Sequence, residues 1–177
     1  MEKLVIHGGN PLQGTVRVSG AKNAVLPIIV ASMLATTEST LQEIPQLDDV
    51  HTVCEVISSL GVKIDSSQEG TLVIDAANLD SFSAPYDFVR RMRSSFLVMG
   101  PLLARKRIGK ISLPGGCSIG ARPIDLHLKA FEAMGAKVNL ENGYIEASVP
   151  EGLKGAQIYL DFPSVGATEN ILMAASM

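Results

Sequence analysis

Residues 49–64 read DVHTVCEVISSLGVKI, and residues 125–138 read DLHLKAFEAMGAKV. Each segment opens on an Asp, keeps its apolar side chains at helical spacing and reaches a glycine, Gly61 or Gly135, before a short apolar stretch. Helical spacing that ends in a glycine predicts an amphipathic helix with a left-handed C-terminal cap. Since the same pattern occurs twice, the chain contains an internal repeat.

Further elements repeat around these two helices. Each is preceded by a more apolar predicted helix and followed by an extended, apolar segment. The apolar helices are expected at 25–34 and 88–103, and the extended segments at 71–74 and 144–147. This order predicts an α/β fold of repeated helix–strand units, with the apolar helices packed inside and the sheets outside.

A third unit begins at residues 155–160, and its apolar helix is expected to start near Glu169 and to run to Met177. No cap or polar tail closes this helix, so the sequence favours a truncated chain over a terminal helix docked on its own core. We then expect Ile171, Leu172, Ala174 and Ala175 to be partly uncovered, and the isolated chain to be marginally stable or self-associating, and inactive.

Composition excludes several classes of function. The 177 residues are 46% hydrophobic and 19% charged, and the net charge of −3 disfavours nucleic acid and anionic membranes as partners. No apolar run reaches the 18 to 20 or so residues that span a bilayer, and the start of the chain does not resemble a signal peptide. Two Cys and three scattered His suggest no metal site, and the Cys usage indicates a reducing compartment, the cytoplasm.

The most informative segment for function is LPGGCSIGARPIDLH, residues 113–127. It places Cys117 in a glycine-flanked loop, with Arg122 and Pro123 expected where a helix begins. A thiol, a guanidinium and a helix N-terminus together would form an anion site with an acid or nucleophile beside it. The alternative is a buried Cys next to an ordinary tight turn.

Cations also stand at the start of two other predicted helices. Lys22 and Asn23 precede the apolar helix that carries Pro27, which is expected near that helix's first turn. They suit a phosphate or carboxylate, or they are a solvated Lys and a helix-capping Asn. Arg93 lies on a flank of the next apolar helix. Its neighbours Arg90 and Arg91, and Arg105, Lys106 and Arg107 further on, are interpreted as surface or structural cations.

Three strings resemble the UDP-N-acetylglucosamine enolpyruvyl transferases, and the resemblance runs from Met1 to Met177. They are residues 113–127, Ser19-Gly20-Ala21-Lys22-Asn23-Ala24 with Leu26-Pro27, and Met92-Arg93-Ser94-Ser95 through Gly100-Pro101-Leu102. The resemblance implies an inside-out α/β barrel. Residues 1–20 would form a strand of a second, mostly missing domain, and residues 21–177 most of the domain that carries the Cys loop.

The resemblance also implies a reaction: transfer of enolpyruvyl from phosphoenolpyruvate to the 3-hydroxyl of UDP-N-acetylglucosamine, with release of phosphate. Cys117 would donate the proton and form a phospholactyl adduct, with Lys22 and Arg122 stabilising charge. Phosphoenolpyruvate would be held by Lys22, Asn23 and Arg122. The nucleotide sugar would contact Arg93, Arg122, Pro123, Ile124, Asp125, Leu126, Ser164 and Val165. The base would be an Asp of the second domain, and no cofactor or metal is expected.

The remaining candidates have structural interpretations. Cys54 is expected in the core, and Asp48, Asp49, His51 and His127 are expected as capping or surface residues. Residues 113–121 are expected to form a lid over the substrates. The alternatives are a 3-phosphoshikimate 1-carboxyvinyltransferase, disfavoured because that enzyme lacks the Cys-bearing loop, and a non-catalytic nucleotide-sugar-binding module of the same fold.

Overall fold

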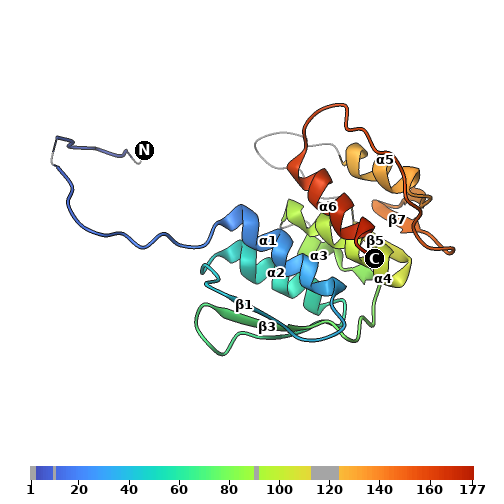
Figure 1. Cartoon of the computed structure of the whole chain (residues 1–177), viewed down its shortest axis with the longest axis horizontal. Coiled ribbons are helices and arrows are strands. Elements are labelled where there is room, and N and C mark those ends of the chain that lie inside the picture. Colours follow the sequence, from blue (N-terminus) through green and yellow to red (C-terminus); the bar gives the residue numbers. More distant parts are fainter. Residues whose placement is uncertain (1–2, 10, 90–91, 113–123) are drawn as a thin grey trace.

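The computed structural model describes residues 3–9, 11–89, 92–112 and 124–177. Residues 11–20 extend away from the body of the molecule (Figure 1). Residues 3–9 and 11–20 are exposed and form no helix or strand, and Arg17 pairs with Glu43 across 2.6 Å. That this segment joins the sheet of a second domain stays a prediction.

The first repeat unit has the predicted order of helices and strands. Its elements are α1 (Lys22–Ala31), η1 (Ser32–Leu34), β1 (Ser39–Gln42), α2 (Asp48–Ser58), β2 (Lys63–Asp65) and β3 (Thr71–Asp75). The strands form an antiparallel sheet in the order β1-β3-β2. Asp48 and Asp49 lie in the first turn of α2, where carboxylates complement the helix dipole. Gly61 ends the helical segment at φ +101°, a conformation that L side chains rarely adopt.

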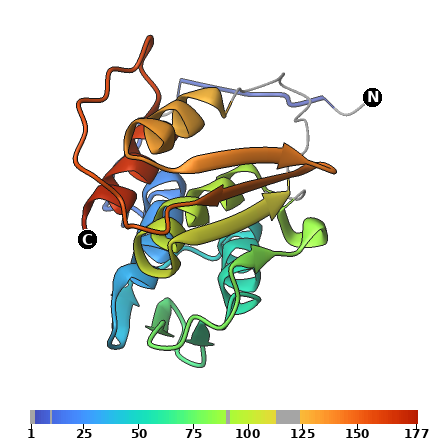
Figure 2. The same ribbon diagram turned by 90° about the vertical axis from the view of Figure 1, so that its right-hand side faces the viewer.

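The second unit repeats this order around a larger sheet. Its elements are β4 (Ser83–Ala84), α3 (Tyr86–Val89), η2 (Arg93–Val98), α4 (Met99–Lys106), β5 (Ile108–Ser112), α5 (Asp125–Ala133), β6 (Lys137–Glu141) and β7 (Tyr144–Ser148). The sheet order is β4-β5-β7-β6, with β4 parallel to β5 and the other pairs antiparallel. Figure 2 shows the strands of this sheet side by side; Ile111, Ile145 and Ala147 on one face are buried in the core, whereas Lys110 and Glu146 pair on the opposite, solvent-facing side. Gly135, at φ +94°, closes α5 as Gly61 closes α2.

The prediction of one continuous helix over residues 88–103 is wrong. The chain forms α3, the 3₁₀ helix η2 and then α4. Pro101 lies in the first turn of α4 and has no N–H to donate to the carbonyl of Leu97, so α-helical bonding does not extend back through it. The apolar stripe that predicted this helix is nonetheless buried, namely Val89, Met92, Phe96, Met99 and Leu103.

Two further helix starts differ from the prediction. Helix α1 begins at Lys22, and Pro27 lies inside it rather than near its first residue. The third-unit helix, α6 (Val165–Ala175), begins four residues before Glu169 because Ser164 caps it: the Ser164 hydroxyl accepts from the N–H of Ala167 at 3.3 Å. No strand forms at residues 155–160.

The core lies where the apolar helices meet. Helix α4 packs against α6, and α1 packs against α2. Arg105 at the end of α4 joins the two units, because its guanidinium donates to four carbonyls of the first unit, those of Met33, Ala35, Ala76 and Ala77. On α6, Ala174 is buried and Ile171 packs against the core, whereas Leu172 and Ala175 are exposed. The prediction that these four residues of α6 are partly uncovered is therefore only partly correct.

Candidate functional site

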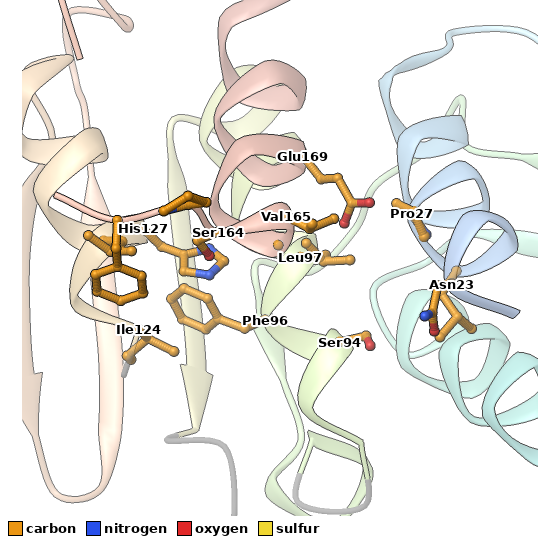
Figure 3. A pocket seen from close by; sticks show the side chains of 15 residues that line it. Asn23, Pro27, Ser94, Phe96, Leu97, Ile124, His127, Ser164, Val165 and Glu169 are labelled. Atoms are coloured by element: carbon orange, nitrogen blue, oxygen red, sulfur yellow. The ribbon is translucent and has the colours of Figure 1, made fainter. Parts of the chain in front are cut away.

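A cavity of about 670 Å³ lies where the first turns of three helices, η2 and the turn before α6 meet. Figure 3 shows the side chains that point into it. The lining residues are Asn23, Leu26, Pro27, Ser94, Phe96, Leu97, Ile124, Leu126, His127, Phe162, Pro163, Ser164, Val165, Gly166 and Glu169. The lining is largely apolar with a few polar groups from separate elements, which is the usual composition of a small-molecule site.

Helix α1 contributes its first turn. Asn23 lines the cavity, while the ammonium group of Lys22 contacts the carboxylate of Asp49 at the start of α2. Pro27 has no N–H, so the carbonyl of Asn23 lacks its usual α-helical donor. Asp49 was expected as a capping or surface residue, and it additionally holds the Lys22 side chain at the helix N-terminus.

Helix α6 contributes its N-terminus. Ser164, Val165 and Gly166 all line the cavity, and the Ser164 side chain caps the helix. The first N–H groups of an α-helix have no intrahelical acceptor and carry the positive end of the dipole. This part of the cavity is therefore suited to an anionic or carbonyl oxygen.

Helix α5 contributes Leu126 and His127, and Ile124 precedes it as the N-cap residue. The imidazole of His127 meets the ring of Phe96 edge-on, with ring centroids 5.2 Å apart and an interplanar angle of 85°. Burial lowers the pKa of His127 to about 4, opposed by the nearby charge of Asp125. His127, expected as a capping or surface residue, is partly buried, because Phe96 of η2 and Asn170 of α6 cover this side of α5.

Glu169 projects from α6 toward Pro27 and Asn23 (Figure 3). Burial raises the pKa of its carboxyl group. The sequence predicted no site role for Glu169, and none for Phe96, although Phe96 lies within the string of residues 92–102 that resembles the family. Their part in the cavity follows from the packing of α6 and η2.

The structure brings five of the predicted site residues to one cavity: Asn23, Ile124, Leu126, Ser164 and Val165. Asp125 and Lys22 lie in the first turns of α5 and α1, next to residues that line it. Arg93 is the first residue of η2. Cys117, Arg122 and Pro123 lie outside the described residues, as do Arg90, Arg91 and the expected lid over 113–121.

A second cavity of about 550 Å³ separates α2 from the three-stranded sheet, and Cys54 lines it. Cys54 is half-buried against the core rather than wholly inside it. Burial raises the pKa of its thiol to about 11, so this thiol is protonated and unreactive at neutral pH. Within the described ranges, no three His, Cys, Asp or Glu side chains gather as metal ligands do, and none of the helices has the length and apolarity to cross a membrane.

Two solved structures share this fold. The enolpyruvyl transferase NikO from Streptomyces tendae superposes with a TM-score of 0.73 at 21% identity, covering 96% of this chain and 40% of that one. EPSP synthase from Acinetobacter baumannii gives a TM-score of 0.69 at 22% identity, covering 91% and 37%. The mixed α/β architecture of the enolpyruvyl transferases is thus confirmed.

Sequence relatives are much closer. UDP-N-acetylglucosamine 1-carboxyvinyltransferase 2 of Carboxydothermus hydrogenoformans is 58% identical over 99% of this chain and 41% of its own length. UDP-N-acetylglucosamine 1-carboxyvinyltransferase 1 of Halalkalibacterium halodurans is 56% identical over 100% of this chain and 40% of its own length. The UDP-N-acetylglucosamine 1-carboxyvinyltransferase of Shewanella denitrificans is 52% identical over 100% of this chain and 42% of its own length. The chain spans about 40% of the length of the curated relatives it matches. The model of the EPSP synthase (3-phosphoshikimate 1-carboxyvinyltransferase) family matches residues 6–177, and the chain belongs to this family.

Proposed function

We propose that the protein containing this chain transfers enolpyruvyl from phosphoenolpyruvate to the 3-hydroxyl of UDP-N-acetylglucosamine, releasing phosphate. One observation carries the proposal: residues from three separate segments that the resemblance assigned to the substrates meet in a single cavity. Identity of 52–58% to enzymes named for this reaction supports the choice of nucleotide sugar over shikimate 3-phosphate.

The chemistry requires a proton given to the methylene carbon of phosphoenolpyruvate, and a new bond from the sugar oxygen to its central carbon. The hydroxyl proton goes to a base. Loss of a proton from the new methyl group and of phosphate from the central carbon then restores the enol ether. We assign the proton donor to Cys117, since a free thiol has a pKa of about 8.5 and is mostly protonated near neutrality. We assign the base to an Asp of the second domain.

The phosphoenolpyruvate subsite is assigned to Lys22, Asn23 and Arg122. The position of Lys22 and Asn23 in the first turn of α1 supports this, because both a cation and a helix N-terminus stabilise phosphate. A cation fixed beside the leaving phosphate also stabilises the charge that develops in the transition state. The contact with Asp49 would orient the Lys22 ammonium group before substrate binds.

The nucleotide-sugar subsite is assigned to Arg93, Arg122, Pro123, Ile124, Asp125, Leu126, Ser164 and Val165. Of these, Ile124 and Leu126 offer apolar surface and Ser164 and Val165 form the start of α6. Apolar side chains suit the face of a base, and a helix N-terminus suits a diphosphate.

The test is phosphate release by the full-length protein with phosphoenolpyruvate and either UDP-N-acetylglucosamine or shikimate 3-phosphate. We expect turnover with the nucleotide sugar, and a loss of about a hundredfold or more in kcat/KM for Lys22→Met. Lys63→Met, which removes an exposed Lys on β2, is the matched control and should be neutral. Turnover with shikimate 3-phosphate would contradict the substrate assignment. Binding of the nucleotide sugar without turnover would identify a non-catalytic module.

A further inference from the structure

A single buried carboxamide connects three elements behind the cavity. Asn170 on α6 is fully buried. Its Oδ1 accepts from the backbone N–H of Gly100 at 2.8 Å, and its Nδ2 donates to the carbonyl of Phe96 at 3.0 Å. The same Nδ2 lies 3.1 Å from Nδ1 of His127. The carboxamide therefore makes three short contacts, one to each of α4, η2 and α5.

The two backbone partners fix which end of the carboxamide faces His127. A peptide N–H can only donate, so Gly100 requires the oxygen of Asn170, and a carbonyl can only accept, so Phe96 requires the nitrogen. The second hydrogen of that NH₂ group is left for His127. Because an NH₂ group of this kind only donates, Nδ1 of His127 must accept, and the neutral ring carries its proton on Nε2.

The Nε2 atom lies close to the first turn of α6. A Cβ atom added to Gly166 would stand 3.9 Å from Nε2 and 3.8 Å from the adjacent Cε1. The edge-on contact with Phe96 fixes the plane of the ring, and His127 lies among the side chains that line the cavity (Figure 3). The imidazole N–H and the first N–H groups of α6 therefore lie in the same region of the cavity.

The ring is also neutral under ordinary assay conditions. Burial lowers the pKa of His127 to about 4, although Asp125 on the same helix favours the charged form. Near neutral pH, His127 therefore adds a donor to the cavity without adding a charge.

We propose that Asn170 is a positioning residue that holds His127 as its Nε2–H tautomer, and that this N–H donates to an acceptor oxygen of the UDP part of the substrate. The inference rests on the proposed function and deepens it, by naming a nucleotide contact that the sequence placed on the surface. Phosphate and carbonyl oxygens both accept from a neutral N–H, and the start of α6 favours the diphosphate.

The first experiment reads the tautomer directly and needs no ligand. The full-length protein is labelled with ¹⁵N-histidine, and a multiple-bond ¹H–¹⁵N spectrum distinguishes protonated from unprotonated ring nitrogens. His127→Gln identifies the His127 signals by their loss. We expect an unprotonated Nδ1 and a protonated Nε2 in the wild type. In Asn170→Asp the carboxylate still accepts from Gly100 but now requires a proton on Nδ1, so the tautomer should reverse. A wild-type ring protonated on Nδ1 overturns the proposal.

The second experiment measures UDP binding by calorimetry. A reversed tautomer presents a bare Nε2 to the ligand, so Asn170→Asp should weaken UDP binding by about ten- to hundredfold, as expected for one lost hydrogen bond plus a repulsive lone pair. The KM for phosphoenolpyruvate should change by less than about threefold. Asn139→Asp makes the same chemical change at an exposed position on β6 and should bind UDP as the wild type does.

A pair of His127 variants separates donation from packing. His127→Gln can accept from Asn170 and still donate into the cavity, so it should keep UDP affinity within about threefold. His127→Phe keeps a ring against Phe96 without a donor, and it should lose affinity as Asn170→Asp does. This pair decides the role of the N–H even if Asn170→Asp fails to fold. Wild-type affinity in a folded His127→Phe protein refutes the contact. Absence of UDP binding by the wild type would instead overturn the proposed function, and the tautomer spectrum would still decide what Asn170 does.

Discussion

Gly100 on α4 faces Asn170 so closely that replacing it with Ala should destabilise the fold. A Cβ at this position would lie 2.5 Å from both the backbone carbonyl oxygen and the Oδ1 of Asn170, and 3.4 Å from the N–H nitrogen of Ala174. Real Cβ atoms essentially never come within 3.0 Å of another heavy atom. Since one of the two oxygens belongs to the backbone, α6 must shift away from α4, and the Gly100–Asn170 hydrogen bond lengthens or breaks.

The magnitude follows from three contributions. Overpacking in a core costs about 1 to 3 kcal/mol, and a buried N–H left without its acceptor costs about 1 to 3 kcal/mol. Ala is favoured over Gly inside a helix by up to about 1 kcal/mol, which offsets part of this loss. We therefore expect Gly100→Ala to lower the free energy of unfolding by about 3 kcal/mol.

Urea unfolding of the full-length protein, followed by far-ultraviolet circular dichroism, measures this change as a lower midpoint at unchanged slope. Gly155→Ala is the matched control, because a Cβ there meets nothing within 4 Å and φ lies outside the left-handed region. It should leave the midpoint unchanged or raise it slightly. Equal midpoints for Gly100→Ala and the wild type would refute the close packing of α4 on α6.

Three more predictions concern single side chains. Because the pKa of His127 falls from about 6.5 in the unfolded chain to about 4 in the fold, only the unfolded state gains this proton as the pH drops below 6.5. The unfolding free energy should therefore decrease by up to about 3 kcal/mol between pH 6.5 and 4, and His127→Gln should remove this component of the pH-dependent unfolding curve. Arg105→Met removes the donors to four carbonyls and should cost about 2 to 4 kcal/mol in urea unfolding, whereas Arg107→Met, which loses one exposed bond to Pro150, should cost less than about 1 kcal/mol. Iodoacetamide at pH 8 should modify Cys117 before Cys54, whose thiol pKa is raised to about 11; peptide mapping that found Cys54 modified first would contradict the assignment of the reactive thiol.

The repeat could be predicted from the sequence, because the residues that mark each helix and its end lie close together along the chain. Gly61 and Gly135 end their helices as expected, and the apolar stripes of α2 and α5 face the core. The errors occur where a terminus depends on one capping side chain or on a missing N–H. Ser164 moves the start of α6 toward the N-terminus, and Pro101 interrupts α-helical bonding before α4.

The network around Asn170 was beyond prediction from the sequence for a different reason. Asn170 lies 70 residues from Gly100, 74 from Phe96 and 43 from His127, and no motif links these positions. A buried Asn inside an apolar helix is the one available signal, since a carboxamide in a core must find partners. A buried Asn thus indicates that hydrogen-bond partners exist, but it does not identify them or show which side chain the Asn orients.

The position of the cavity follows from the repeat itself. Each unit contributes an apolar helix or its amphipathic partner, and α1, α5 and α6 all contribute residues of their first turn, namely Asn23, Leu126 and Val165. Aligned helix N-termini add their partial positive charges in one place. The positive ends of these helix dipoles therefore face the cavity, although the net charge of the chain is −3. Because these dipoles belong to helices packed in the core, the same burial that stabilises the units also holds the binding groups in position.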